Sequence, residues 1–179
     1  MLNGQLFAAL ELKSQVGSFG NNFNNRTEEA VGSATDLWAA YREGAFKLSL
    51  RPWLGYMILL EEAHDSTREV EVKEPHFEFL EEFRGSSYSL ESKSRGKKER
   101  AGVSYAKRYE LLCKKLVRES LYDAACFLLS DKQNGLSGEY KTSAPELSFT
   151  NFITPLIGRA FAYSMMHGRS IDTDTTEIR

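Results

Sequence analysis

The sequence has few of the residues that build metal clusters, disulfide frameworks or membrane spans. It contains two cysteines and three histidines, and no grouping of them has the spacing of zinc ligands. Cys113 and Cys126 both lie in apolar stretches, which favours buried free thiols in a reducing compartment. No apolar run reaches the roughly 18–20 residues of a membrane span, and the amino-terminal residues lack a signal-peptide pattern. These absences predict a cytoplasmic protein with no membrane segment, zinc site or disulfide.

Positive and negative charges nearly balance over the whole chain, with a formal net charge of −2, but they are unevenly distributed. Residues 61–82 carry nine acidic and two basic residues, whereas residues 93–118 carry ten basic and two acidic residues. A basic block of this kind is typical of a surface that faces a polyanion, and equally of a solvated loop and helix face. Its candidate phosphate contacts are Lys107, Arg108, Lys114 and Lys115.

The hydrophobic pattern alternates between strands and helices. Short apolar runs predict strands over residues 5–13, 54–60 and 122–129, the first two of them covered on both faces. Helical spacing predicts helices over 25–44, 104–120 and 149–167. As an alternative to a strand, residues 122–129 could extend the predicted helix over 104–120. Residues 14–25, rich in Ser, Gly and Asn, predict a loop that ends with Asn25 as a helix cap.

This alternation predicts a single α/β domain over residues 1–168, with a mixed central sheet flanked by helices. Residues 86–103 predict an exposed basic insertion, and residues 169–179 a polar tail. Asn3 and Gly4 indicate a hairpin turn. A hairpin needs an earlier strand, so we expect the first strand of this unit to be missing from the chain.

Glu11 and Lys13 are two residues apart on a predicted strand, so their side chains share a face near its carboxyl end. Burying such charges is costly unless they meet partners or a cation. A carboxylate can hold Mg²⁺, and a lysine can neutralise a phosphate or orient the attacking water. The spacing is common, however, and recurs at Glu71 and Lys73. In isolation, a surface ion pair is the simpler explanation.

The residues after this pair carry the side chains that read base edges in DNA. Asn contacts adenine and Arg contacts guanine through paired hydrogen bonds, and the candidates here are Gln15, Asn21, Asn22, Asn24, Asn25 and Arg26. The stretch is therefore either a groove-reading loop or an asparagine-rich turn with a helix cap. Glu29 is a further candidate metal ligand. Alternatively, Glu28 and Glu29 are first-turn residues that favour the helix dipole.

Several separate motifs together resemble the XhoI-type restriction endonucleases. They are ALELKSQVG (9–17), FGNNFNNR (19–26), EEA (28–30), RPWLGY (51–56), EPHF (74–77), SYAKRYELLC (104–113) and YDAA (122–125). The resemblance covers most of residues 5–130. As a set these motifs are specific, which the Glu-x-Lys spacing alone is not.

The resemblance implies a PD-(D/E)XK nuclease core of α/β class. It implies a type II enzyme of a restriction-modification system that cuts palindromic double-stranded DNA, CTCGAG in the family, with Mg²⁺ as cofactor. Glu11 and Lys13 match the second half of the catalytic motif, with Glu11 as the metal ligand. A homodimer follows from the palindrome, and a cognate DNA methyltransferase is the implied functional partner.

The sequence departs from the family pattern in two places. The family's metal-binding aspartate lies upstream of the Glu-x-Lys strand, and this chain has no Asp before Asp36. The resemblance therefore implies an amino-terminal truncation that removes a helix as well as the first strand. Residues 87–102 are longer than the family pattern. From the sequence we expect an endonuclease whose lone catalytic pair binds Mg²⁺ weakly, so that this chain does not cleave DNA. The alternatives are a DNA-binding remnant that cannot cut and an unrelated interaction protein.

Overall fold

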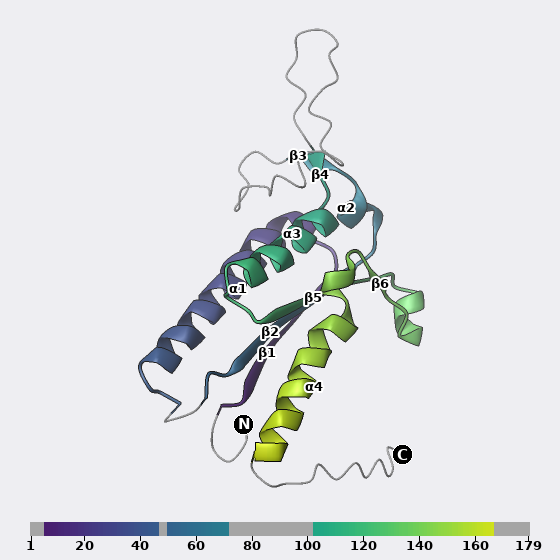
Figure 1. The fold of residues 1–179 in the computed structure, drawn as a ribbon. Helices are drawn as coiled ribbons and strands as arrows, with labels where there is room; N and C mark the ends of the chain where they lie inside the picture. Colours follow the sequence, from purple (N-terminus) through teal and green to yellow (C-terminus); the bar gives the residue numbers. More distant parts are fainter. Residues whose placement is uncertain (1–5, 47–49, 72–101, 167–179) are drawn as a thin grey trace.

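The computed structural model describes residues 6–46, 50–71 and 102–166 (Figure 1). Strands and helices alternate along the chain, as the hydrophobic pattern predicts. The strands are β1 (Ala8–Gln15), β2 (Trp53–Glu61), β3 (Val70–Glu71), β4 (Gly102–Val103), β5 (Ala124–Ser130) and β6 (Lys141–Thr142). The α-helices are α1 (Phe19–Arg42), α2 (His64–Thr67), α3 (Tyr105–Arg118) and α4 (Phe149–Met166).

The main sheet has the strand order β1-β2-β5-β6. β1, β2 and β5 are parallel, and β6 is antiparallel to β5. Figure 1 shows α1 and α3 together on one face of this sheet and α4 on the other. The predicted class, an α/β fold with a mixed sheet between helices, is confirmed. β3 and β4 form a separate two-stranded ladder.

β2 is the central strand, as its apolar run predicts. Tyr56, Ile58 and Leu60 are fully buried in the main core, under α1 and α3. On the other face, Trp53 packs with Phe152 of α4 in a second cluster, and Met57 lies against that cluster. A strand buried on both faces reads as a continuous hydrophobic run, and β2 has that arrangement as far as Ile58, beyond which Leu59 is 37% exposed.

β1 differs from the prediction of a strand covered on both faces. Leu10 is 49% exposed and Leu12 is 65% exposed. On the opposite face of the strand, Ala9 packs against the helix-covered core and Gln15 is buried. The prediction is wrong because α4 packs mainly over β5, so the central part of β1 has a layer of helices on one face only.

The predicted loop over residues 14–25, with Asn25 as the helix cap, is also wrong. α1 begins at Phe19, so Asn25 lies well inside it. Asparagine has a weak intrinsic preference for helix, but tertiary packing overrides such preferences. Here Phe23 is buried against Tyr109, with ring centroids 4.9 Å apart in an edge-on contact. That burial extends the helix toward its amino terminus.

The remaining predicted elements are confirmed. α3 follows Ser104, whose hydroxyl accepts a hydrogen bond from the backbone N–H of Lys107 at 3.2 Å. β5 and α4 lie where the sequence predicts them. No helix in the part of the chain that the structure describes is long and apolar enough to cross a membrane. The Asn3-Gly4 turn, most of the basic insertion and the polar tail lie outside the described residues.

Candidate hydrolytic site

β1 carries Glu11 and Lys13 on the face that α1 covers. In the register with β2, Glu11 lies beside Tyr56 and Lys13 beside Ile58, two residues that are fully buried under the helices. Glu11 is therefore in the middle of β1 rather than at its carboxyl end, which corrects the sequence-based placement. Both side chains are largely shielded, with 14% of Glu11 and 22% of Lys13 exposed.

Two carboxylates converge on the ammonium group of Lys13. Its Nζ lies 3.1 Å from Oε1 of Glu11 and 3.1 Å from Oε2 of Glu29. The same oxygen of Glu29 accepts a hydrogen bond from Nη1 of Arg26 at 2.9 Å. Four charged side chains from β1 and α1 thus form one cluster, which we call the Lys13 cluster: Glu11, Lys13, Arg26 and Glu29.

Glu29 reaches this cluster because α1 starts earlier than expected. No acidic residue lies in the first turn of α1, so the interpretation of Glu28 and Glu29 as first-turn residues is wrong. Asn22, Arg26 and Glu29 follow the i, i+4, i+7 spacing of one helix face. From that face Glu29 reaches Nζ of Lys13, although 46% of its side chain stays exposed.

The cluster keeps Lys13 charged. Burial by itself lowers the pKa of Lys13, but hydrogen bonds and charge attraction from Glu11 and Glu29 outweigh it, so the pKa lies above its ordinary value of 10.5. Hydrogen bonds from Arg26 and then Lys13 hold the pKa of Glu29 below its ordinary value of 4.5. At neutral pH Lys13 is a proton donor and a positive charge, and it does not act as a base.

Tyr122 is a site residue that the sequence did not single out. It is 1% exposed, and its hydroxyl donates to Oε2 of Glu11 and faces the backbone carbonyl oxygen of Ala30 at 2.9 Å. The sequence places it at the entry to an apolar strand, which indicates a core residue. The signal available was weak: a polar aromatic residue next to Asp123, just before β5.

The donor set of the Lys13 cluster suits a hard divalent cation. Oε1 of Glu11 is buried and contacts Nζ of Lys13 at 3.1 Å, so it could coordinate a cation if Lys13 moved aside. Among the described residues, no three or more His, Cys, Asp or Glu side chains gather as a complete ligand set. Mg²⁺ does not need such a set, since it is commonly held by one or two carboxylates plus waters and substrate phosphates. Glu11 and Glu29 fit that requirement.

The amide residues predicted to read bases lie on α1 and not on a loop. Asn21, Asn24 and Asn25 are exposed on its amino-terminal half, and Asn22 is half-buried. Arg26 also lies on this helix, within the Lys13 cluster. The structure therefore brings an amide-rich helix surface close to the candidate catalytic pair.

Gln15 has a different position from the one that a base-reading residue requires. It is only 3% exposed, and its amide donates to the backbone carbonyl of Gly17. A buried side chain cannot reach a base edge in a groove. Gln15 instead holds the turn that joins β1 to α1, which corrects its inclusion among the DNA contacts.

The cations of α3 are engaged with partners. Lys107 and Lys114 both contact Oε1 of Glu110, at 2.8 Å and 3.0 Å. Lys115 pairs with Glu119. Arg108 stacks over the ring of Phe23, 4.0 Å from its centroid, and this places it against α1. Arg108 is thereby tied directly to the helix bearing the asparagines.

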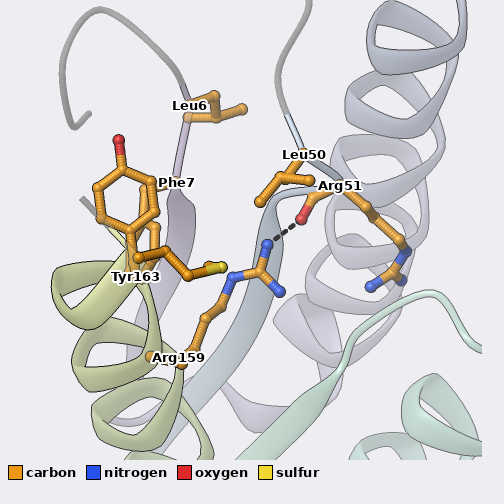
Figure 2. A pocket seen from close by; sticks show the side chains of 8 residues that line it. Leu6, Phe7, Leu50, Arg51, Arg159 and Tyr163 are labelled. Carbon is orange, nitrogen blue, oxygen red and sulfur yellow. Dashed lines mark hydrogen bonds between the residues drawn. The ribbon is translucent and has the colours of Figure 1, made fainter.

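A separate cavity of about 350 Å³ lies at the amino ends of β1 and β2 (Figure 2). Leu6, Phe7, Leu50 and Tyr163 give it apolar walls. Arg159 crosses it and donates to the backbone carbonyl of Arg51. None of the described residues that line it carries a carboxylate, and Glu11 and Lys13 are not among them. This cavity is therefore not the candidate hydrolytic site.

Comparison with known proteins identifies the family of the chain. The family model described as restriction endonuclease XhoI matches residues 1–94 and 89–142. The chain belongs to this family. The matched XhoI-family segments include β1 and α1, which carry the Lys13 cluster, and Tyr122 just before β5.

Curated relatives in the XhoI family are type II restriction enzymes. BstVI from Geobacillus stearothermophilus is 52% identical over 85% of this chain and 61% of its own length. XhoI from Xanthomonas vasicola is 46% identical over 63% of this chain and 39% of its own length. The chain thus spans about two fifths to three fifths of these relatives. No solved structure matches it.

Proposed function

We propose that this chain acts as a Mg²⁺-dependent, type II site-specific deoxyribonuclease that hydrolyses phosphodiester bonds in double-stranded DNA at CTCGAG. The observation that carries the proposal is the convergence of Glu11 and Glu29 on Lys13. Membership of the XhoI family supports it. The expectation of an incomplete site rested on the absent upstream aspartate; in this proposal Glu29, a candidate metal ligand from the sequence, takes the place of the second carboxylate.

Each residue of the Lys13 cluster has a chemical task in this proposal. Glu11 and Glu29 would hold Mg²⁺, which when bound supplies the positive charge that stabilises a phosphate under attack. Lys13 stays protonated, so it donates a hydrogen bond to the phosphate or orients the attacking water. Arg26 keeps Glu29 ionised and in place.

The exposed asparagines of α1 are the proposed base contacts, and Arg26 lies on the same helix. Asn21, Asn24 and Asn25 can each offer an amide to an adenine edge. Arg108 is the best-placed phosphate contact of α3, because it packs on α1. Lys107, Lys114 and Lys115 would first have to leave the carboxylates that they contact.

The working assembly that we propose is a homodimer in the cytoplasm, since a palindromic site calls for two-fold protein symmetry. A cognate DNA methyltransferase would protect the host's own copies of the site. These parts of the proposal follow from the family and from the symmetry of the DNA.

A plasmid cleavage assay tests the proposed function. The chain should linearise a plasmid with one CTCGAG site in Mg²⁺ and leave a matched plasmid without the site intact. Glu11→Gln should abolish cleavage, while binding to the site in Ca²⁺ persists. Cleavage that Glu11→Gln does not affect would refute the assignment of the site.

The same experiment separates the two alternatives. Site-specific binding without cleavage in Mg²⁺ would identify a DNA-binding protein that does not cut. No binding to duplex DNA even at low salt would favour an interaction protein with a basic segment, because phosphate contacts are strongest at low salt.

A further inference from the structure

Tyr122 contacts the Lys13 cluster through its hydroxyl group. Its hydroxyl donates to Oε2 of Glu11 and also faces the carbonyl oxygen of Ala30, 2.9 Å away. Ala30 is the residue that follows Glu29 on α1. One buried phenol therefore contacts β1 at the first carboxylate and α1 beside the second.

The backbone around Tyr122 is anchored on both sides. Nε1 of Trp38 on α1 donates to the carbonyl of Leu121 at 2.8 Å. The backbone N–H of Leu54 on β2 donates to Oδ2 of Asp123 at 2.7 Å. A residue held between two such contacts is a rigid support for whatever its side chain touches.

The two carboxylate oxygens of Glu11 have different contacts in this arrangement. Oε2 accepts from Tyr122, whereas Oε1 is buried and lies 3.1 Å from Nζ of Lys13. A glutamate side chain has several rotatable bonds, and fixing one oxygen directs the other. The fixed oxygen faces the phenol, so Oε1 points to the place where positive charge gathers.

We propose that Tyr122 is a positioning residue of the candidate hydrolytic site, which orients the Glu11 carboxylate so that Oε1 is presented to a divalent cation. This inference rests on the proposed function and adds to it a residue that touches neither the metal nor the DNA. Tyr122 acts through Glu11. Groups that orient metal ligands in this way usually contribute about 10- to 100-fold to metal affinity.

Tyr56 provides a matched control. It lies beside Glu11 in the strand register, and its ring meets that of Tyr122 edge-on, with centroids 5.3 Å apart. Its hydroxyl is also buried, but it makes no hydrogen bond. Tyr56→Phe and Tyr122→Phe therefore remove the same atom from the same part of the core, and only Tyr122→Phe removes a bond to Glu11.

The test measures Mn²⁺ binding to the full chain. The electron paramagnetic resonance signal of the free ion reports how much Mn²⁺ remains unbound. Tyr122→Phe should weaken Mn²⁺ binding by about tenfold or more, and Tyr56→Phe should leave it unchanged. Glu11→Gln should weaken binding as well. Adding Tyr122→Phe to Glu11→Gln should produce no further loss, because the phenol acts only through the carboxylate. Circular dichroism confirms the fold of each variant.

Two other outcomes have distinct meanings. If Glu11→Gln weakens Mn²⁺ binding but Tyr122→Phe does not, the positioning role is refuted and the proposed metal site stands. If neither substitution changes binding, the proposed metal site fails and the positioning role fails with it. Should Tyr122→Phe not fold, Glu11→Asp keeps the carboxylate but shortens its reach to the phenol. Unchanged Mn²⁺ affinity in Glu11→Asp would overturn the inference.

Discussion

Lys13 of β1 and Glu29 of α1 form an ion pair, with Nζ 3.1 Å from the carboxylate oxygen. The connection between the two elements makes this possible. Gly17 and Ser18 both adopt left-handed backbone conformations, with φ of +60° and +46°, which reverse the chain so that α1 packs back over β1. The backbone N–H of Gly17 donates to Glu61 at 3.0 Å and ties this turn to the end of β2.

The first prediction concerns the pH dependence of this ion pair. Arg26 and Lys13 lower the pKa of Glu29 from 4.5. The stabilisation is therefore fully present above about pH 4.5 and is lost as the pH falls through the lower, folded-state pKa. Glu29→Gln should reduce the free energy of unfolding by about 0.2–1 kcal/mol at pH 7, since the pair is partly exposed.

Urea denaturation at pH 7 and pH 3 measures this difference, with Glu28→Gln at the neighbouring exposed position as the control. The effect of Glu29→Gln should shrink at pH 3, below the ordinary pKa of 4.5, because the carboxyl of the unfolded chain is already protonated there. An equal loss at both pH values would show that the charge of Glu29 does not stabilise the fold.

The second prediction separates a structural from a DNA-binding role for the lysines of α3. Lys114 lies 3.0 Å from Oε1 of Glu110, whose side chain is only 7% exposed. Lys114→Gln should lower the free energy of unfolding by about 1–3 kcal/mol, because it leaves a buried carboxylate with fewer donors. Lys115 pairs with Glu119, which is 54% exposed, so Lys115→Gln should cost at most about 0.5 kcal/mol.

Thermal unfolding measures both lysine variants. A salt titration of DNA binding completes the comparison, because loss of one phosphate contact reduces the salt slope by about one. Equal destabilisation by the two substitutions would contradict the structural role assigned to Lys114.

The third prediction concerns the packing of α4 on the sheet. A Cβ atom added at Gly55 would lie 2.4 Å from the ring of Trp53 and 2.8 Å from the ring of Phe152. Gly55→Ala should therefore destabilise the fold by about 1–3 kcal/mol through overpacking. Gly32 in α1 has no atom within 4 Å of such a Cβ, so Gly32→Ala should stabilise it by up to about 1 kcal/mol.

Differential scanning calorimetry should show a lower Tm for Gly55→Ala and a higher Tm for Gly32→Ala. A Gly55→Ala variant as stable as the parent chain would show that α4 does not pack closely on β2.

The fourth prediction is that two asparagines of α1 affect protein stability and DNA recognition in opposite directions. Asn24 and Asn25 are exposed inside the helix. Alanine is a better helix former by about 0.5 kcal/mol per residue, so Asn24→Ala and Asn25→Ala should slightly raise the Tm. If these amides read bases, the same variants should bind the CTCGAG duplex about tenfold less tightly, as a lost paired contact costs about 1–3 kcal/mol.

Fluorescence anisotropy with cognate and scrambled duplexes measures that specificity. Variants that are more stable and equally specific would remove these asparagines from the recognition surface.

Much of the fold could be predicted from the sequence. The buried run in β2, the helix α3 and the apolar strand β5 are all encoded locally, through period and propensity. Glu11 and Lys13 were identified with their shared face, because strand periodicity fixes which residues lie side by side. The motifs of the XhoI family added a chemistry that spacing could not.

The start of α1 and the partners of the charged pair were decided by tertiary structure. Phe23 finds a ring to pack against only when α3 is present, and this packing overrides the loop-like composition around it. Glu29 and Tyr122 reach Glu11 and Lys13 from distant parts of the chain. No local pattern predicts such contacts, because they depend on how helices and strands lie across one another. The sequence by itself determined the charged pair, and the packing of α1 and the Tyr122 segment against β1 determined its surroundings.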